Sequence, residues 1–244
     1  MSVEQKPLGV REQRDRMSGT ITRRRSKLAP DPDTRRAIVT AAATSLREHG
    51  VQGLSIAAVL QRAQLSTRAF YRHFESKDQL VSAVFLVMAK AEKRRLRRKM
   101  AAAGTPAEAV AAWIDGRLDL AFSENIKSDL RHMSIEAQSQ SFAVPELIQP
   151  AYAEMLEPLI AQIQRGLEQG TFHDVDPTNG AQSIQGVVWA STERQWATGH
   201  CERAEVRART VRFCLRGLGV TAGTIARISG NHAPQPDQEE TQWT

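Results

Sequence analysis

Cysteine is nearly absent from this sequence, which has only Cys201 and Cys214 among its 244 residues. Two cysteines cannot build a disulfide-rich secreted scaffold, and a chain of this length buries enough apolar surface to fold without disulfides or metals. We therefore expect both cysteines to behave as small buried side chains in a reducing compartment, which places the protein in the cytoplasm.

Long hydrophobic runs are missing as well. The longest, from Leu80 to Ala89, is interrupted by Ser82 and is about half of the roughly 20 residues that a membrane-spanning helix needs. The basic N-terminus lacks the apolar segment of a signal peptide. Runs of alternating β-branched residues are also absent, which argues against a series of strands. These absences predict an all-α protein with no membrane partner.

Sequence motifs for catalysis are absent too. The chain has no nucleophile motif and no glycine-rich phosphate loop. His173, Asp174 and Asp176, and the pair His200 and Cys201, lack a recognised metal-ligand spacing and fall at predicted helix ends, where polar residues are common. We therefore expect no catalytic residue, no metal site and no cofactor, and we do not expect an enzyme.

Positive charge is in excess, with 33 lysines and arginines against 27 aspartates and glutamates. This balance favours a polyanionic partner such as DNA. The cluster Arg23, Arg24 and Arg25 lies in a polar segment in which apolar residues show no periodic spacing. We interpret this segment as a flexible basic arm over residues 1–30. Extended chain from Arg25 to the first helix spans roughly 20 Å, so the arm either reaches a neighbouring minor groove or adds only nonspecific charge.

A second basic run lies between Lys93 and Lys99. Its cations cover more than one face of a helix, so they cannot all touch a single DNA backbone. We interpret this run as mostly solvated rather than as a dedicated phosphate-binding site.

Capping residues divide the middle of the chain into about nine helices. Asp31 followed by Pro32 is a helix start with proline at the first helical position, and Gly50 is a suitable stop. Pro158 is expected to kink or interrupt a later helix. The helices predict a small domain over residues 31–77, a larger helical domain over 78–228 and a flexible tail over 229–244. The other predicted starts are Ser55, Ser66, Ser76 with Gln79, Thr105 with Pro106 and Glu108, and Asp176 with Pro177.

The stretch LSTRAFYRHFESKDQL, from Leu65 to Leu80, crowds basic and aromatic residues together. On a helix, Phe70 and Phe74 share one face, whereas the basic and hydroxyl-bearing side chains gather on another. The preceding helix offers an apolar stripe for the two phenylalanines, and the short link between the helices forces a steep crossing. This layout predicts a helix-turn-helix, whose second helix enters the major groove of double-stranded DNA.

The exposed residues of this stretch suit contacts with DNA. Arg68 can offer a bidentate fork to guanine, and Thr67 can donate a hydrogen bond or touch a thymine methyl group. Tyr71, His73 and Lys77 suit phosphates, which position a protein without specifying sequence. The remaining predicted DNA-binding residues are Ser55, Ser66 and Arg72, together with the three arginines of the arm.

Residues Leu54 to Leu80 resemble the DNA-binding region of the TetR family of bacterial repressors. The signature of that family near the recognition helix runs roughly A-G-V-S-x-x-T-L-Y-x-H-F-x-x-K-x-x-L, and this chain has AQLSTRAFYRHFESKDQL in its place. Gln64 replaces the usual turn glycine, so the turn has to hold a side chain, in a left-handed conformation. Ala69 replaces the usual threonine, which removes one hydroxyl that would contact DNA.

The resemblance implies that the chain beyond about residue 90 forms a ligand-binding and dimerisation domain. Aromatic and methionine side chains with a few polar groups suit a small, largely apolar effector. Packing in a core explains the same residues nearly as well. The residues that we predict to bind ligand are Trp113, Arg117, Phe122, Met133, Glu136, Tyr152, Met155 and Trp189.

The resemblance also implies a homodimer through the last two long helices, from Asp176 to His200 and from Glu202 to Gly217. Such a dimer would present two recognition helices about one DNA turn apart, roughly 34 to 36 Å, to a near-palindromic operator. The predicted function is that of a transcriptional repressor released by ligand, since repression is the commonest mode of the family. The alternative is a DNA-binding or architectural protein without an effector. A solidly packed larger domain would support that alternative.

Overall fold

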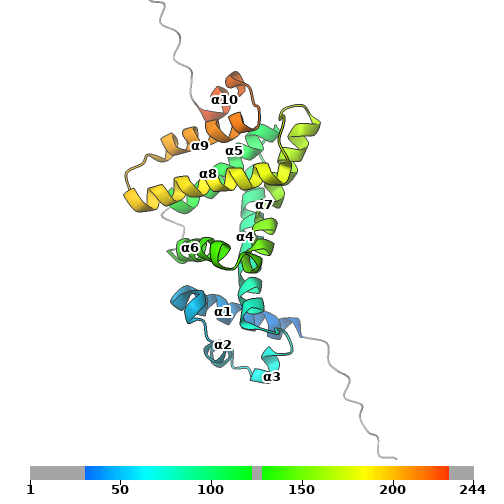
Figure 1. The fold of residues 1–244 in the computed structure, drawn as a ribbon, viewed down its shortest axis with the longest axis vertical. Coiled ribbons are helices and arrows are strands. Elements are labelled where there is room, and N and C mark those ends of the chain that lie inside the picture. The colour runs from blue at the N-terminus through cyan, green and yellow to red at the C-terminus, as the bar shows by residue number, and fades with distance from the viewer. Residues whose placement is uncertain (1–30, 123–127, 231–244) are drawn as a thin grey trace, which may run out of the picture.

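A computed structural model describes residues 31–122 and 128–230, which form ten α-helices and no strand (Figure 1). The predicted all-α fold is confirmed, with one helix more than expected. Arg23, Arg24, Arg25 and the rest of the predicted arm lie outside the described residues, as does the tail beyond Gly230. The helices are α1 (Pro32–Gly53), α2 (Ile56–Ala63), α3 (Thr67–Phe70), α4 (Lys77–Met100), α5 (Pro106–Phe122), α6 (Ser128–Ala143), α7 (Pro145–Glu168), α8 (Pro177–Thr198), α9 (Arg203–Gly217) and α10 (Ala222–Ser229).

The helix starts follow the capping residues. The Asp31 carboxylate accepts hydrogen bonds from the backbone N–H groups of Asp33 and Thr34 at 3.1 and 3.2 Å. At the start of α5, Glu108 N–H donates to Thr105 Oγ1 at 3.2 Å, and Thr105 N–H donates to Glu108 Oε2 at 3.1 Å. These bonds satisfy amides that have no partner within the helix, so the helix boundaries are set by local sequence.

Helices α1 to α3 form a small unit at one end of the molecule (Figure 1). Phe70 and Phe74 are fully buried in it, with ring centroids 5.7 Å apart, and Val59 of α2 is buried beside them in the same core. Gln64 in the turn between α2 and α3 has φ 54° and ψ 41°, so the predicted left-handed conformation is confirmed. Helix α3 is shorter than predicted because regular α-helix ends at Phe70, although Phe74 N–H still donates to Phe70 O.

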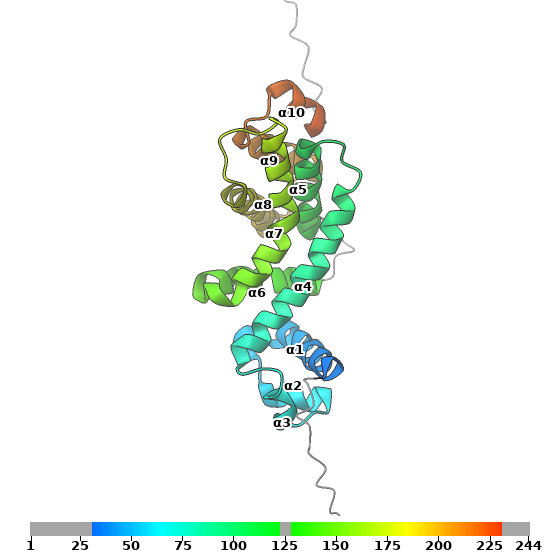
Figure 2. The same cartoon turned by 90° about the vertical axis from the view of Figure 1, so that its right-hand side faces the viewer.

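Helix α4 connects this small unit to the rest of the chain (Figure 2). It packs against α1 near its start and against α5 and α7 along its remainder. No described helix is long and apolar enough to cross a membrane. The long α4 therefore belongs to both parts of the molecule, and a shift of its axis would reach both.

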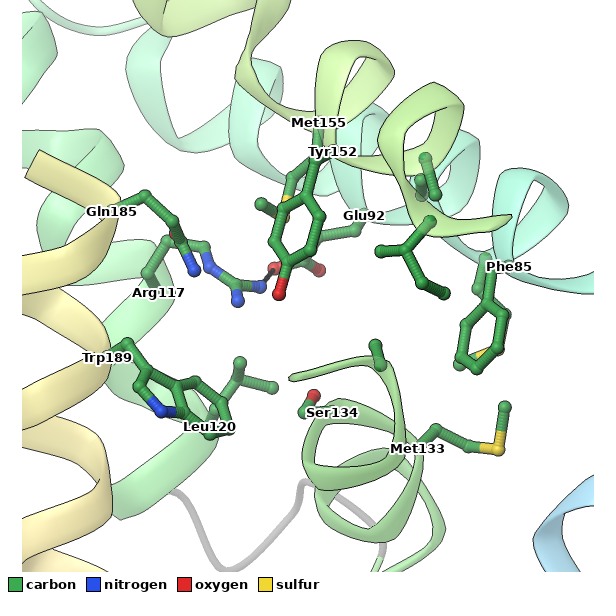
Figure 3. A pocket seen from close by; sticks show the side chains of 15 residues that line it. Phe85, Glu92, Arg117, Leu120, Met133, Ser134, Tyr152, Met155, Gln185 and Trp189 are labelled. Atoms are coloured by element: carbon green, nitrogen blue, oxygen red, sulfur yellow. Dashed lines mark hydrogen bonds and ion pairs between the residues drawn. The ribbon is translucent and has the colours of Figure 1, made fainter. Parts of the chain in front are cut away.

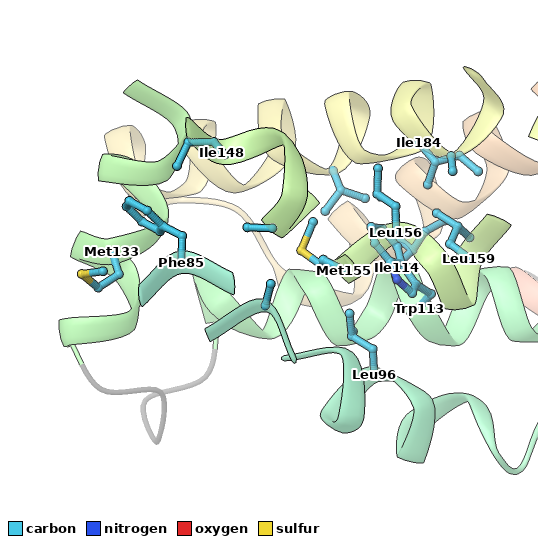
Figure 4. Packing of buried hydrophobic residues seen from close by; sticks show 14 of the residues in the cluster. Phe85, Leu96, Trp113, Ile114, Met133, Ile148, Met155, Leu156, Leu159 and Ile184 are labelled. Atoms are coloured by element: carbon cyan, nitrogen blue, oxygen red, sulfur yellow. The ribbon is translucent and has the colours of Figure 1, made fainter. Parts of the chain in front are cut away.

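The core of the larger part is formed by α4, α5, α7 and α8 (Figure 4). Leu96, Trp113 and Ile114 are fully buried there, and Leu159 of α7 and Ile184 of α8 complete the packing. Helix α7 runs through Pro158 as one continuous helix, so the interruption that we considered there does not occur.

Four of the six cations in the basic run of α4 make ion pairs, although Arg94, Arg97, Arg98 and Lys99 remain exposed to solvent. The interpretation as a mostly solvated run rather than a phosphate-binding site stays a prediction. Lys93 Nζ lies 3.0 Å from Glu154 and 3.2 Å from Glu157, and Arg97 lies 2.8 Å from Glu157, which joins α4 to α7. Arg95 and Lys99 pair with acidic residues of α4 and α5 instead. The sequence could not reveal these pairs because their acidic partners mostly lie on helices distant in the chain.

Candidate functional site

A surface of exposed basic and hydroxyl-bearing side chains covers α3 and the turn after it. Thr67, Arg68 and Arg72 are exposed, and 63% of Tyr71 is exposed although its ring makes an edge contact with buried Phe70, at 5.2 Å between centroids. Within the described residues, neither arginine takes part in a salt bridge. These side chains are held on a fixed core and remain free to bind an external partner.

The other residues predicted for this surface have roles within the protein. Lys77 Nζ donates to the carbonyl of Gln52 at 3.3 Å, and His73 is partly buried, with no hydrogen-bond partner for Nδ1 in the part of the chain that the structure describes. Ser55 Oγ and Ser66 Oγ accept hydrogen bonds from backbone amides at the starts of α2 and α3. Both serines are exposed and keep a hydroxyl hydrogen to donate outward.

A cavity of about 80 Å³ lies between α4, α5, α6, α7 and α8 (Figure 3). Among the residues predicted to bind ligand, the cavity wall brings together Arg117, Met133, Tyr152, Met155 and Trp189. The other three lie elsewhere, since Trp113 is buried in the core, Phe122 is packed at its edge, and Glu136 contacts α1.

Helix α4 also contributes to this cavity, which was not predicted from the sequence. Phe85, Met88, Ala89 and Glu92 all line it. Their spacing of three, four and seven residues places them on one face of a helix, and this signal was available in the sequence. The remaining lining residues are Leu120, Ser134, Ala137, Ile148, Ala151 and Gln185.

At one end of the cavity, a buried carboxylate contacts a buried guanidinium. Arg117 Nη1 lies 2.9 Å from Glu92 Oε1, and both side chains are largely buried. Arg95 binds the same carboxylate with two bonds of 2.8 Å. Burial on its own would raise the pKa of Glu92, but the hydrogen bonds and charges of Arg95 and Arg117 outweigh it and lower the pKa. Glu92 is therefore ionised at neutral pH.

This ion pair continues into a network that reaches α9. Arg95 also binds Asp119 of α5 at 3.0 Å, and Asp119 accepts a bond of 2.9 Å from Arg203. Burial would raise the pKa of Asp119, but Lys99, Arg203 and Arg95 together lower it. The network connects the cavity to the penultimate helix through charged groups that hold one another in place.

Comparisons with known proteins show what this arrangement of helices is similar to. The family model described as bacterial regulatory proteins of the tetR family matches residues 38–84, from within α1 to the first turns of α4. Residues 38–84 form a TetR-family DNA-binding domain. The resemblance seen in the sequence is thus confirmed, and the exposed surface of α3 lies within the matched residues. No curated protein sequence matches the chain significantly.

Solved structures extend the similarity to the whole fold. RolR in complex with resorcinol is 22% identical, with a TM-score of 0.59 over 83% of this chain and 96% of that chain. FadR from Bacillus subtilis in complex with stearoyl-CoA is 15% identical, with a TM-score of 0.59 over 75% of this chain and 98% of that one. A TetR-family regulator from Shewanella sp. PV-4 is 16% identical, with a TM-score of 0.57 over 76% and 97%. At these identities the likeness shows the fold alone, which this chain shares with these structures over three quarters or more of its length.

The TetR-type domain also contacts the wall of the cavity through α6. Gly50 has φ 67° and interrupts the helical conformation of α1, and the next amide, Val51 N–H, donates to Glu136 Oε1 at 3.1 Å. Glu136 lies on the same helix as Met133, Ser134 and the rest of the α6 wall of the cavity. Two helices, α4 and α6, therefore connect the cavity to the DNA-binding domain.

Replacing Glu136 with alanine is expected to destabilise this junction. The buried Val51 amide would lose its acceptor, which costs about 1–3 kcal/mol of unfolding free energy. Glu136→Gln keeps an oxygen at the same place and serves as the control. We expect faster hydrogen exchange at the Val51 amide in Glu136→Ala than in Glu136→Gln, and equal exchange in the two variants would contradict the role of this bond.

Among the described residues, no group of three or more histidine, cysteine, aspartate or glutamate side chains is placed to bind a metal ion. Cys214 is buried, which raises the pKa of its thiol to about 12, and Cys201 is half-buried. At neutral pH the Cys214 thiol is protonated and behaves as a small apolar side chain.

Proposed function

We propose that the protein is a homodimeric transcriptional repressor that a small ligand releases from a near-palindromic operator. The observation that supports this most directly is the course of α4, which begins beside the DNA-facing surface and lines the cavity with its middle turns. A ligand that favours one position of α4 would thereby favour one spacing of the two DNA-binding domains. We take residues 31–77 as the DNA-binding domain and 78–228 as the effector and dimerisation domain.

On DNA, Thr67 and Arg68 reach base edges in the major groove, because they lie at the exposed start of α3. Tyr71, Arg72 and the flanking polar groups bind phosphates. Lys77 is a phosphate ligand on release from the Gln52 carbonyl. The arm arginines Arg23, Arg24 and Arg25 add minor-groove contacts, as their position shortly before α1 allows.

Helices α8 and α9 form the dimer interface in this proposal. A groove between them is lined by Ile184, Val187 and Cys214, and Phe213 at its edge has 64% of its surface exposed. An exposed phenylalanine beside an apolar groove suits a self-complementary contact across a two-fold axis.

The proposal that a small ligand acts as the effector rests on the cavity and on two solved structures of similar fold. RolR was solved with resorcinol and FadR with stearoyl-CoA, so proteins of this fold bind small molecules of different size. The apolar walls with one polar end suit a small, largely apolar ligand. A DNA-binding protein without an effector is the other candidate, and the cavity in the larger domain disfavours it.

The first test is a fluorescence-anisotropy titration of the purified protein with DNA from beside its own gene. Unrelated duplex DNA serves as the competitor. Tight binding that survives the competitor would establish a sequence-specific regulator. The protein could instead bind neither the DNA beside its gene nor any fragment from a genomic selection more strongly than random DNA. That result would contradict the proposed regulation and favour an architectural role.

Arg68 and Lys77 are expected to make different contributions to binding. Arg68→Ala should lose about 1–3 kcal/mol on the operator and relax its sequence preference, because a bidentate base contact disappears. Lys77→Ala should weaken operator and random DNA alike. Competitive titrations with both duplexes measure the two effects, and equal losses on both duplexes for both variants would defeat this division of roles.

A further inference from the structure

We propose that the effector is a compact, uncharged molecule with a hydroxyl group, which binds between the Glu92 carboxylate and the Arg117 guanidinium with an apolar body of about one ring. This inference rests on the proposed function and specifies the ligand of the same cavity. The contacts of the two charged residues, the volume of the cavity and the chemistry of its walls each restrict the ligand.

The volume restricts the ligand in size. The cavity measures about 80 Å³. A cavity of roughly 150 Å³ is known to bind benzene, and pockets for drug-sized ligands reach volumes of several hundred Å³. Met88, Met133 and Met155 line the cavity, and their flexible side chains can move to admit one ring. A long acyl chain or a multi-ring compound would require the helices to separate.

The walls restrict the body of the ligand to apolar chemistry. Beyond the polar end, Phe85, Leu120, Met133 and Met155 face the space (Figure 3), and Met88 and Ile148 line it as well. These side chains offer no strong hydrogen bond, so a polar group placed among them would lose its hydration without compensation. Ser134, Tyr152, Gln185 and Trp189 also line the cavity and carry polar atoms, but none of the four is charged. We place the polar part of the ligand beside Glu92 and Arg117.

The charges at that end exclude an ionised ligand. Glu92 and Arg117 are the two charged residues among the described lining residues. Arg95, which also binds Glu92, pairs with Asp119 in turn, so the charges of these four groups cancel. Glu92 cannot swing away to admit an anion, because Arg95 holds both of its carboxylate oxygens with bonds of 2.8 Å. A carboxylate on Arg117 would lie close to the Glu92 carboxylate, and an ammonium on Glu92 would lie close to Arg117. Both arrangements place like charges together in a poorly hydrated site.

A hydroxyl group avoids both conflicts because it donates one hydrogen bond and accepts others. It can donate to Glu92 and accept from Arg117 while their own 2.9 Å contact persists. Two buried atoms at this end, Nε of Arg117 and Oε1 of Gln185, have no hydrogen-bond partner among the described residues, one needing an acceptor and the other a donor. A single neutral group with both functions matches this environment.

The test compares four one-ring probes with the full-length protein at pH 7 by isothermal titration calorimetry: phenol, toluene, benzoate and benzylammonium. We expect phenol to bind about tenfold or more tightly than benzoate and benzylammonium, and several-fold more tightly than toluene. Benzoate or benzylammonium binding as tightly as phenol would overturn the proposal, and so would the absence of binding by all four probes at millimolar concentration.

The variant Glu92→Gln tests the charge argument directly. It preserves the shape of the side chain but leaves Arg117 unbalanced, so the preference for phenol over benzoate should fall about tenfold or reverse. Glu154→Gln weakens an ion pair between α4 and α7, the one with Lys93, which lies outside the cavity wall, and should leave the preference unchanged. An unaltered preference in Glu92→Gln would overturn the proposal.

Two measurements keep the outcome interpretable. Circular dichroism reports whether Glu92→Gln folds, and the selectivity of the unaltered protein tests the proposal even where the variant does not fold. DNA titrations without any probe report on the proposed regulator by themselves. Specific DNA binding together with a preference for benzoate would thus refute the ligand class alone, whereas loss of specific DNA binding would refute the regulator.

Discussion

Raising the monovalent salt concentration from about 50 to about 200 mM is expected to weaken DNA binding by about a thousandfold or more. A dimer that neutralises about six to ten phosphates releases a similar number of condensed cations, and added salt opposes that release. The exposed Arg68 and Arg72, which make no salt bridge among the described residues, are available for such contacts. Anisotropy titrations at several salt concentrations give the slope of log affinity against log salt.

Lys77→Ala provides the comparison for this slope. Loss of one phosphate contact lowers the slope by about 1, so a dimer that loses two contacts should show a decrease of about 2. A nearly flat salt response of the unaltered protein would mean that few phosphates are contacted, and it would contradict binding through the α3 surface.

Phe70→Ala is expected to lower the free energy of unfolding by about 3–5 kcal/mol. Phe70 is fully buried between α2 and the turn after α3, and its ring contacts both Phe74 and Tyr71. Truncation would leave a cavity in the core that α1, α2 and α3 share. Because the same ring holds α3 in position, DNA binding should be lost together with stability.

Tyr71→Ala is the matched control because the two aromatic residues are adjacent. Tyr71 is 63% exposed, so its truncation should cost less than about 1 kcal/mol in stability while still weakening DNA binding. Denaturant unfolding followed by circular dichroism measures the stability, and anisotropy measures the binding. If Phe70→Ala proved no less stable than Tyr71→Ala, the role of Phe70 as the anchor of α3 would be wrong.

The DNA-binding end was largely predictable from the sequence. The caps at Asp31, Ser55 and Ser66 act on amides within three residues of themselves, so their effect does not depend on distant parts of the chain. The left-handed turn at Gln64 likewise follows from the short link between two helices. The end of regular helix at Phe70 was not predicted, because the turn that follows still holds Phe74 in the core.

The cavity was predictable only in part. Methionine and aromatic residues with polar neighbours indicated Met133, Tyr152 and Trp189, but the same composition also selected Trp113, which packs in the core. Helical periodicity shows which residues share a face, yet it does not show whether that face meets a packed neighbour or a space. That difference depends on how closely α4, α6 and α8 approach one another.

Local sequence determined most helix starts and the family of the N-terminal domain, because capping bonds, helical periodicity and the signature around Tyr71 act over a few residues. Tertiary structure decided where the cavity lies and how it is connected to the rest of the molecule. Glu92 meets Arg117 across 25 residues of chain, and Val51 meets Glu136 across 85. Charges pair and amides find acceptors wherever folding brings them within about 3 Å, and no local pattern in the sequence encodes that distance.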